Sequence, residues 1–458
     1  MRWYNGDMEF LNKKILVIGL ARSGMAAIKL LQKIGVNDIT VSEMKEVKDE
    51  DRKILEDLGV IITNQDMSVF EGDYDLVIKN PGVPPISPIV KRLEERHIPI
   101  ITEIELAYKV SKPQHYIAIT GTNGKTTTTT ITYELLKKAF KDKAHVGGNI
   151  GTPLCELVLE HNLLEEEGHY ISLEISNHQL VDIVDFKPEL STIINLTPDH
   201  LATMGSLDAY YKSKTEVYRN TDSNDTFILN TDDEVLKEYT DKYKINANIQ
   251  TFSLDKKDTY GYIDDGYIII NNEKVLPLDA IKIVGKHNVQ NIIISLMFAK
   301  KLGISNEDIY EVISNFKGVE HRIEFVKVIN GVKYYNDSKG TNTDATITAL
   351  KAFDKNVILL VGGFEKGLDM SEMRNYLGCV KQVIGFGVAG KRIASDLVNN
   401  PIVVTDLVEA TNIAYNMAKP GDVVLLSPTT SSFDQYSGYE ERGRHFKQIV
   451  NNLWVMTI

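Results

Sequence analysis

The chain has 458 residues, a length typical of about three domains. With 43% hydrophobic and 25% charged residues, its composition is ordinary for a globular protein and excludes a disordered, collagen-like or coiled-coil chain. Acidic residues outnumber basic ones by 63 to 51, and the net charge of −12 argues against a nucleic acid or an anionic membrane as a partner. We therefore expect local clusters of lysine and arginine wherever an anionic ligand binds.

The cysteine content and the first residues predict the cellular compartment. The two cysteines, Cys155 and Cys379, belong to no CxxC motif, so no disulfide framework is expected. The first residues, MRWYNGDMEFLNKK, contain acidic and polar side chains where a signal peptide needs an apolar segment. No apolar run approaches the ~20 residues that span a bilayer. These features predict a cytoplasmic protein without membrane insertion.

The first part of the chain alternates apolar runs with helical patterns. Residues 15–18, 39–43 and 75–85 are predicted to form strands, and residues 25–34 have the apolar periodicity of a helix. Strands that alternate with helices predict βαβ units and a parallel sheet. The pattern then begins again, so we expect a first domain over residues 1–111.

Two further sets of alternating elements follow. The second set begins with the strand YIAIT at residues 116–120, a glycine-rich turn and a long helical pattern, and its polar region over residues 221–275 is expected to be an insert of short strands. The third set contains the strand-like runs KYYNDS, NVILLVGG, QVIGFG and DVVLLSP. We therefore expect three α/β domains, the second over residues 112–317 and the third over residues 318–458. Ligands should bind at the carboxyl ends of the strands.

The strongest functional signal is TGTNGKT at residues 120–126, between a predicted strand and a predicted helix. Glycines let backbone N–H groups approach phosphate oxygens, Lys125 can neutralise phosphate charge, and the Thr126 hydroxyl can reach Mg²⁺. The motif departs from the usual GxxxxGK[ST], because Ile119 occupies the first glycine position. A glycine turn with a solvated lysine is the weaker alternative in this strand–loop–helix context. The sequence therefore predicts a nucleotide phosphate site.

A second glycine turn, GLARSG at residues 19–24, is a poor dinucleotide fingerprint. Ala21 replaces the middle glycine, which lets the backbone approach a pyrophosphate, so a hydride-transfer enzyme is disfavoured. The turn still offers a helix N-terminus and Arg22 to an anion. A purely structural turn explains the motif equally well.

Oxygen ligands for Mg²⁺ are expected at the ends of two strands of the second domain. Glu174 ends the strand-like run YISLE, and Asp199 and His200 follow the run STIINLT. Each of these residues taken alone is commonly just a polar strand end. Their significance comes from their expected place on strand ends beside the glycine-rich loop.

Three polar loops follow strands of the third domain: NDSKGTN, GGFEKG and SPTTSS. Lys339, Thr341, Lys366 and Ser432 in these loops are candidates for a pocket that binds a carboxylate. For any one of them, a solvated loop residue is the commoner role. Further along the chain, residues 440–442 (EER) taken alone are typical of a solvated helix face.

Taken together, these motifs resemble the Mur ligase family of ATP-dependent amide-forming enzymes. The resemblance rests on TGTNGKT, the strand end at Glu174, NLTPDHL, HNVQN and HRIE. Within that family, GLARSGMAA, NPGVP, NDSKGTN and SPTTSSFDQYSGYEERG are similar to the members that add D-glutamate, and the match extends from about Ile15 to about Phe446. The DNPR motif of the lysine- or diaminopimelate-adding members is absent. Folylpolyglutamate synthases, which share the central chemistry, would lack the first domain.

This resemblance implies a fold and an activity. The expected fold is an N-terminal Rossmann-like domain, a central P-loop ATPase-like domain and a C-terminal Rossmann-like domain. The expected activity joins D-glutamate to UDP-N-acetylmuramoyl-L-alanine through an acyl phosphate, with ATP and two Mg²⁺ sites, in cytoplasmic peptidoglycan precursor synthesis. The expected partners are these small molecules, and the protein is expected to be a monomer.

The resemblance also implies roles for individual residues. The residues implied in ATP binding are Gly121, Thr122, Asn123, Gly124, Lys125, Thr126, Thr127, Asn291, Arg322 and Asp337. Those implied in binding the uridine diphosphate substrate are Gly19, Leu20, Ala21, Arg22, Ser42, Gly82, Asn149, Gln179 and His200. Those implied in D-glutamate binding are Lys339, Thr341, Lys366, Ser432 and Tyr439. The implied metal ligands are Thr126, Glu174, His200 and a carbamylated Lys214, and the implied catalytic residues are Lys125, Glu174, His200, Lys214 and Lys366.

The sequence departs from the family pattern at a few positions. Asn177 and His178 replace a serine and an aromatic residue, Tyr439 stands where phenylalanine is more familiar, and Glu43 lies near a position often occupied by aspartate. A family member that adds a different amino acid is therefore the alternative enzyme. A nucleotide-binding regulatory or scaffold protein is an alternative of another class, but it would need neither Glu174 nor the lysines of the third domain.

Overall fold

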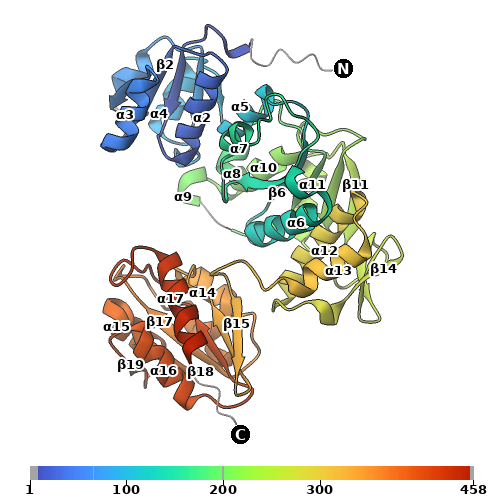
Figure 1. Cartoon of the computed structure of the whole chain (residues 1–458), viewed down its shortest axis with the longest axis vertical. Helices are drawn as coiled ribbons and strands as arrows, with labels where there is room; N and C mark the ends of the chain where they lie inside the picture. Colours follow the sequence, from blue (N-terminus) through green and yellow to red (C-terminus); the bar gives the residue numbers. More distant parts are fainter. Residues whose placement is uncertain (1–8, 65–66, 199–200, 454–458) are drawn as a thin grey trace. The chain divides into compact units, whose positions relative to one another are not determined.

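The structure is a computed structural model in which residues 9–64, 67–198 and 201–453 are described. The described strands form three sheets, and their parallel strands alternate with helices (Figure 1). This arrangement confirms the predicted α/β fold. The chain divides into two compact units, the first comprising Met1–Leu278 and Gln290–Val312, the second comprising Asp279–Val289 and Ile313–Ile458.

The first sheet is parallel and has the strand order β3-β2-β1-β4-β5. Its strands are β1 (Ile15–Ile18), β2 (Ile39–Glu43), β3 (Ile61–Asn64), β4 (Leu76–Lys79) and β5 (Ile100–Ile101). Its helices are α2 (Arg22–Lys33), α3 (Asp49–Asp57), α4 (Pro88–Glu95) and α5 (Glu103–Val110). Every residue of β1 and β4 is buried, as expected for parallel strands covered on both faces. This strand order is the one expected of a Rossmann-like domain.

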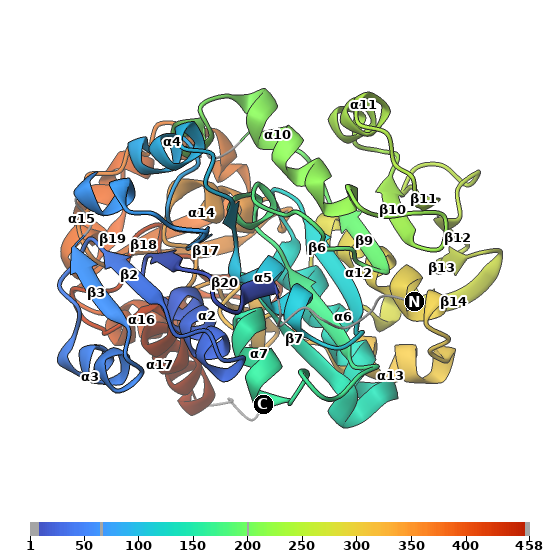
Figure 2. The same cartoon turned by 90° about the horizontal axis from the view of Figure 1, so that it is seen from above.

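The central sheet has the order β14-β13-β12-β11-β10-β9-β6-β8-β7. Its strands are β6 (His115–Thr120), β7 (Ala144–Gly148), β8 (Tyr170–Glu174), β9 (Leu190–Ile193), β10 (Thr226–Asn230), β11 (Asn248–Phe252), β12 (Gly261–Asp264), β13 (Tyr267–Ile270) and β14 (Glu273–Pro277). The strands from β7 to β12 pair in parallel, and β12, β13 and β14 pair antiparallel. Residues 221–275 are therefore no separate insert, because their strands extend the central sheet beyond β9 (Figure 2).

Helices of both α and 3-10 type connect these strands. The α-helices after β6 are α6 (Lys125–Phe140), α7 (Leu154–Glu160), α8 (Asn177–Leu180), α9 (Leu201–Met204), α10 (Leu207–Thr215), α11 (Glu234–Lys242), α12 (Lys286–Lys301) and α13 (Asn306–Asn315). Short 3-10 helices of the described chain are Met67–Glu71, Lys141–Lys143, Glu216–Tyr218, Leu278–Ala280 and Met373–Cys379.

The third sheet has the order β15-β16-β20-β17-β18-β19, with β15 antiparallel at one edge and the other strands parallel. Its strands are β15 (Glu324–Ile329), β16 (Val332–Asn336), β17 (Val357–Gly362), β18 (Val380–Phe386), β19 (Ile402–Val403) and β20 (Val423–Leu426). Its helices are α14 (Thr343–Leu350), α15 (Gly387–Leu397), α16 (Leu407–Met417) and α17 (Tyr439–Asn452). The four strand-like runs of the third set are therefore confirmed. The boundary after residue 317 stays a prediction and lies between α13 and β15.

The first and central sheets are joined by buried polar contacts within the first unit. The Lys79 ammonium at the end of β4 lies 3.0 Å from the Asp182 carboxylate, and its side chain is fully buried. The carboxylate of Glu105 on α5 accepts hydrogen bonds from the three backbone N–H groups of residues 184–186. The domain boundary predicted after residue 111 thus lies between two sheets of the same unit. The boundary itself stays a prediction.

Candidate functional site

The glycine-rich loop connects β6 to α6, as the sequence predicts. Gly124 has φ +86°, and a Cβ at this position would lie 2.5 Å from the Asn291 side-chain oxygen. A larger residue is therefore excluded there by both conformation and space. The close approach also places Asn291, on α12, directly against the loop. Thr126 and Thr127 follow in the first turn of α6, where Thr126 is buried and Thr127 half-buried.

Two ammonium groups converge on one carbonyl of this loop. Lys125 Nζ donates hydrogen bonds to the carbonyl oxygens of Gly121 at 2.9 Å and Thr122 at 2.8 Å. Lys214 Nζ, from α10, donates to the same Gly121 oxygen at 2.9 Å. Lys214 is 1% exposed, and its ammonium lies 4.6 Å from the centre of the Tyr210 ring. Positive charge is therefore concentrated where a strand–loop–helix turn presents backbone N–H groups, which favours a polyphosphate ligand.

Residues after β9 hold the loop from its other side. Asn123 N donates to Asn195 Oδ1 at 2.9 Å, and Asn195 Nδ2 donates to the Asn123 carbonyl at 3.0 Å. The Thr122 hydroxyl donates to the Thr197 carbonyl at 3.0 Å. Asn195 and Thr197 were missed as contributors to the site, although both belong to the NLTPDHL motif. The signal that could have identified them is their place directly after a strand next to the glycine-rich loop.

Glu174 lies at the carboxyl end of β8 and is 2% exposed. Its Oε1 accepts a hydrogen bond of 2.8 Å from Asn149 Nδ2, whereas Oε2 has no hydrogen-bond partner among the described residues. A buried carboxylate oxygen without a donor is suited to a cation. The predicted ligand His200 and its neighbour Asp199 lie outside the described residues.

The turn after β1 connects the first sheet with α7. Leu20 N donates to Glu43 Oε2 at 2.6 Å, so Glu43, the unusual residue at this position, caps the turn that contains Gly19 and Ala21. The exposed Arg22 donates from Nη1 to the Gly151 carbonyl at 2.7 Å. Its other terminal nitrogen lies 3.2 Å from the Glu156 carboxylate.

The remaining residues predicted to bind the uridine substrate lie at strand ends and at one helix start. Ser42, on β2, is fully buried, and its hydroxyl has no partner among the described residues. Gly82 N donates to Asn80 Oδ1 at 2.9 Å. The Gln179 side chain accepts from the backbone N–H of Ser176 at 3.0 Å and completes a capping box at the start of α8. This carbonyl therefore has a local structural partner.

The residues predicted for the carboxylate pocket lie on three loops of the second unit. Lys366 is exposed, and its Nζ donates to the Thr341 carbonyl at 3.3 Å. The ammonium of Lys339 lies 5.3 Å from the centre of the Tyr439 ring. Ser432 is 1% exposed, and its hydroxyl has no partner among the described residues. The structure thus brings together Lys366 with Thr341, and Lys339 with Tyr439.

Asp337 is a buried carboxyl, 5% exposed, at the start of the first of these loops. Its oxygens accept hydrogen bonds from Ser427 Oγ at 2.6 Å and from Ile323 N at 3.2 Å. Burial raises the pKa of Asp337 to about 7, although the exposed Arg322 and the buried Arg442 oppose this rise. The structure therefore places the predicted ribose contact, Asp337, close enough to the predicted phosphate contact, Arg322, for their charges to interact.

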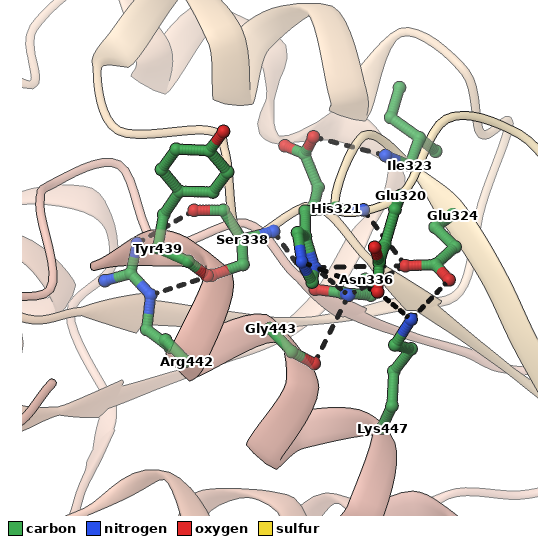
Figure 3. Close-up of polar contacts among 11 residues, drawn as sticks. Glu320, His321, Ile323, Glu324, Asn336, Ser338, Tyr439, Arg442, Gly443 and Lys447 are labelled. Atoms are coloured by element: carbon green, nitrogen blue, oxygen red, sulfur yellow. Dashed lines mark hydrogen bonds and ion pairs between the residues drawn. The ribbon is translucent and has the colours of Figure 1, made fainter. Parts of the chain in front are cut away.

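A polar network that the sequence analysis missed holds the turn before β15 (Figure 3). His321 and Ile323 have positive φ angles of 66° and 43°, an unfavourable conformation for a β-branched residue such as Ile323. Asn336 Nδ2 donates to His321 Nδ1 at 2.9 Å and to Glu324 Oε2 at 3.0 Å. Lys447 on α17 pairs with Glu324 at 2.9 Å. The HRIE motif signalled this turn, but nothing in its residue order signalled its partners on α17.

Arg442 corrects a prediction from the sequence. Residues 440–442 alone indicated a solvated helix face, yet Arg442 is fully buried. Its guanidinium donates to the side chain and the carbonyl of Ser338 and to the carbonyls of Gly362 and Thr430. The prediction was wrong because the charge pattern of a short run does not show which side of a helix faces other loops.

Comparisons with known proteins cover nearly the whole chain. Residues 119–299 match the Mur ligase middle domain, and residues 321–430 match the Mur ligase, glutamate ligase domain. The UDP-N-acetylmuramoylalanine–D-glutamate ligase of Geobacillus sp. (strain WCH70) is 39% identical over 453 residues, which covers 97% of this chain and 98% of that protein.

Solved structures are similar in fold. A UDP-N-acetylmuramate–alanine ligase from Thermotoga maritima has a TM-score of 0.56 at 22% identity, covering 96% of this chain and 99% of that one. A MurF ligase from Thermotoga maritima, in complex with ADP, has a TM-score of 0.53 at 18% identity, covering 98% of this chain and 97% of that one. At these identities the likeness bears on the three-domain fold alone.

Proposed function

The chain belongs to the Mur ligase family, and we propose that it joins D-glutamate to UDP-N-acetylmuramoyl-L-alanine with ATP, in peptidoglycan precursor synthesis. The observation that carries the proposal is the strand–loop–helix turn on which the Lys125 ammonium contacts the Gly121 and Thr122 carbonyls. The chain as a whole is 39% identical, over 97% of its length, to a UDP-N-acetylmuramoylalanine–D-glutamate ligase.

The reaction needs an activated carboxyl group. A carboxylate is anionic and has no good leaving group, so an amine does not attack it readily. Transfer of the γ-phosphoryl group of ATP to the carboxylate of the L-alanyl substrate forms an acyl phosphate and releases ADP. The amine of D-glutamate then attacks the acyl carbon, the C–O bond to phosphate breaks, and the amine loses a proton.

The chain's residues position the groups and stabilise charge in these steps. Backbone N–H groups of the glycine-rich loop and the Lys125 ammonium hold the phosphates. Such transfer depends mainly on alignment and on stabilised charge. The family resemblance alone assigns Arg322 to the phosphates, Asn291 to the adenine base and Asp337 to the ribose hydroxyls.

We propose two Mg²⁺ sites, for which the buried and unpartnered Glu174 Oε2 is the supporting observation. Thr126, Glu174, His200 and a carbamylated Lys214 would hold the ions, which neutralise phosphate charge when bound. Carbamylation turns a lysine into an oxygen ligand, which Mg²⁺ prefers. Acetate or formate should partly restore the activity lost in Lys214→Ala. A fully active alanine variant would remove Lys214 from this role.

The two other substrates are assigned to strand ends. The turn at residues 19–22, with Ser42, Gly82, Asn149, Gln179 and His200, binds the uridine diphosphate substrate. D-glutamate has two carboxylates, and the third sheet offers two cations, Lys339 and Lys366, with the hydroxyls of Thr341 and Ser432 and the ring of Tyr439. Charge-assisted hydrogen bonds of this kind are stronger than neutral ones.

No helix in the described part of the chain is long and apolar enough to cross a membrane. We propose a cytoplasmic monomer that acts on small molecules. Sedimentation of the purified protein at working concentration tests this part of the proposal, and a concentration-dependent dimer would contradict it.

An amino-acid panel tests the proposed reaction. ADP release is measured with ATP, Mg²⁺ and UDP-N-acetylmuramoyl-L-alanine, while L- and D-amino acids are added in turn. We expect D-glutamate to support turnover. Turnover with L-lysine or diaminopimelate instead would favour the alternative family member.

The nucleotide site is tested by Lys125→Ala. We expect loss of ATP turnover by at least about 100-fold, because the variant lacks a cation at the phosphates, while the circular dichroism spectrum stays that of the wild type. Lys137→Ala is the matched control, since Lys137 is an exposed lysine of the same helix. Near wild-type turnover of Lys125→Ala would contradict the assignment.

The D-glutamate pocket is tested by Lys366→Ala. We expect the KM for D-glutamate to rise roughly tenfold or more, as for the loss of a charged hydrogen bond. The KM values for ATP and for the uridine substrate should stay close to wild type. Lys355→Ala, an exposed lysine of the same unit, is the control. Unchanged kcat and KM for D-glutamate would remove Lys366 from the pocket.

A further inference from the structure

Arg442 occupies an unusual position for a cation. It lies in the first turn of α17 and has no exposed surface. Its Nε donates to Ser338 Oγ at 3.0 Å, and Nη2 donates to the Ser338 carbonyl at 2.9 Å and to the Thr430 carbonyl at 3.1 Å. Nη1 lies 3.4 Å from the Gly362 carbonyl. The hydrogen-bond partners of Arg442 are therefore uncharged, and Figure 3 shows the contact with Ser338.

This buried charge has no ion-pair partner within 4 Å among the described residues. Burial lowers the pKa of Arg442 to about 10, and the carboxyls of Asp434 and Asp337 oppose this effect. At neutral pH the guanidinium therefore stays charged. Buried charges in proteins are ordinarily paired, whereas the hydrogen-bond acceptors of Arg442 are uncharged.

The three hydrogen-bonded residues belong to three different loops. Ser338 follows β16, Gly362 ends β17, and Thr430 follows β20, and these strands are neighbours in the sheet in the order β16-β20-β17. A Cβ at Gly363, which has φ +136°, would lie 2.9 Å from Arg442 Nη1. The second loop thus packs directly on the guanidinium, and one side chain holds three strand ends together.

The same three loops contain most of the residues assigned above to D-glutamate. Lys339 and Thr341 follow Ser338, Lys366 lies in the second loop, and Ser432 in the third. A shift of one loop against another would separate these groups. The planar fork of arginine suits several fixed acceptors, whereas a lysine offers a single point charge.

We propose that Arg442 is the positioning residue of the amino-acid pocket, and that its charged hydrogen bonds hold the three loops in one arrangement. This inference rests on the proposed function and deepens it. Its guanidinium is already held by acceptors on Ser338, Gly362 and Thr430, so Arg442 acts on the pocket through these loops.

The test compares Arg442→Met with Arg444→Met, an exposed arginine of the same helix. We expect Arg442→Met to raise the KM for D-glutamate at least about tenfold, the effect of losing charged hydrogen bonds. The KM for the uridine substrate should change less than about twofold, and Arg444→Met should resemble the wild type. A residue that only stabilises the fold would lower the melting temperature and the active fraction without a selective rise in the KM for D-glutamate.

Arg442→Lys keeps the inference testable if the methionine variant does not fold. A buried lysine loses its proton at lower pH than an arginine. The KM for D-glutamate of Arg442→Lys should therefore rise, relative to wild type, between about pH 7.5 and pH 9. Asp337 is already ionised over most of this range, and burial raises the pKa of Tyr436 to about 12.

The outcomes separate the two levels of the proposal. Wild-type protein without turnover on D-glutamate would contradict the proposed function itself. An active wild type together with an unchanged KM for D-glutamate in the folded Arg442→Met variant would overturn the role of Arg442. If only Arg442→Lys folds, its KM for D-glutamate is compared with that of the wild type at each pH. Equal KM values at every pH would also overturn the role of Arg442.

Discussion

Two buried carboxyls, one in each unit of the chain, both have a raised pKa but lie in different surroundings. Burial raises the pKa of both Glu103 and Asp337 to about 7. Glu103 begins α5 and accepts a hydrogen bond of 2.9 Å from Cys155 N, while its Oε1 has no hydrogen-bond partner among the described residues. Asp337 has partners for both oxygens, one on Ser427 and one on the turn before β15.

The difference lies in the neighbouring charges. The charged residue that acts on Glu103 is Glu156, which raises its pKa further, whereas Arg322 and Arg442 lower the pKa of Asp337. Glu103 thus links α5 to α7 through Cys155 N, whereas Asp337 lies near the exposed Arg322. A raised pKa by itself does not distinguish a structural carboxyl from a ligand-binding one. The sign of the surrounding charge is what differs between Glu103 and Asp337.

The largest expected effect is a difference in activity between variants of Asp337 and Glu103. We expect Asp337→Asn to lower kcat/KM for ATP by up to about 100-fold, the upper range for the loss of a charged hydrogen bond. Glu103→Gln should change it less than about twofold. Steady-state kinetics with ATP varied measures both. Equal losses in the two variants would show that burial rather than location determines their importance.

For stability we expect the opposite order, with the larger effect at Glu103 than at Asp337. Glu103→Ala leaves the buried Cys155 N–H without an acceptor, so we expect the free energy of unfolding of the first unit to fall by roughly 1–3 kcal/mol. Glu103→Gln, which keeps an acceptor, is the control. Urea denaturation followed by circular dichroism measures the change. An unaltered midpoint in Glu103→Ala would mean that the contact between α5 and α7 does not depend on this side chain.

The smallest effect concerns pH. Because the folded protein binds the Glu103 proton more tightly than the unfolded chain does, the free energy of unfolding should decrease as pH rises from about 5 to 7, by about 1 kcal/mol for each pH unit. Above the folded pKa this contribution no longer changes. Glu103→Gln should reduce the slope in melting experiments across this range. A slope equal to that of the wild type would contradict the raised pKa.

Local features of the site could be predicted from the sequence. The strand, the glycine-rich loop and the helix at residues 115–140 are contiguous, and their conformations depend on nearby residues. A glycine is needed at position 124, where the backbone is left-handed. The place of Lys125 at the start of the helix follows from the order of the residues alone. Four strands of the third sheet, β16, β17, β18 and β20, were predicted for a similar reason, since buried parallel strands appear as continuous apolar runs, whereas the more exposed β15 and β19 were not predicted.

Features that depend on distant contacts could not be predicted from residue patterns. Arg442 lies in a run of charged residues, and its burial follows from the packing of α17 on three loops. The extension of the central sheet by residues 221–275 was missed as well, because short polar strands give weak periodicity. Both the burial of Arg442 and the place of these strands in the central sheet depend on segments that are distant in the sequence.

The amino-acid sequence by itself determined the α/β class, the phosphate-binding loop, the candidate polar loops at strand ends and, through resemblance, the family. Only the tertiary structure decided that Lys214 meets the Gly121 carbonyl from 93 residues away, that Glu105 joins α5 to the central part of the chain, and that Arg442 is buried. The physical reason is the range of the interactions. Helix, strand and turn preferences act between near neighbours, whereas the burial and pairing of a charge depend on which distant strands the sheet order places side by side.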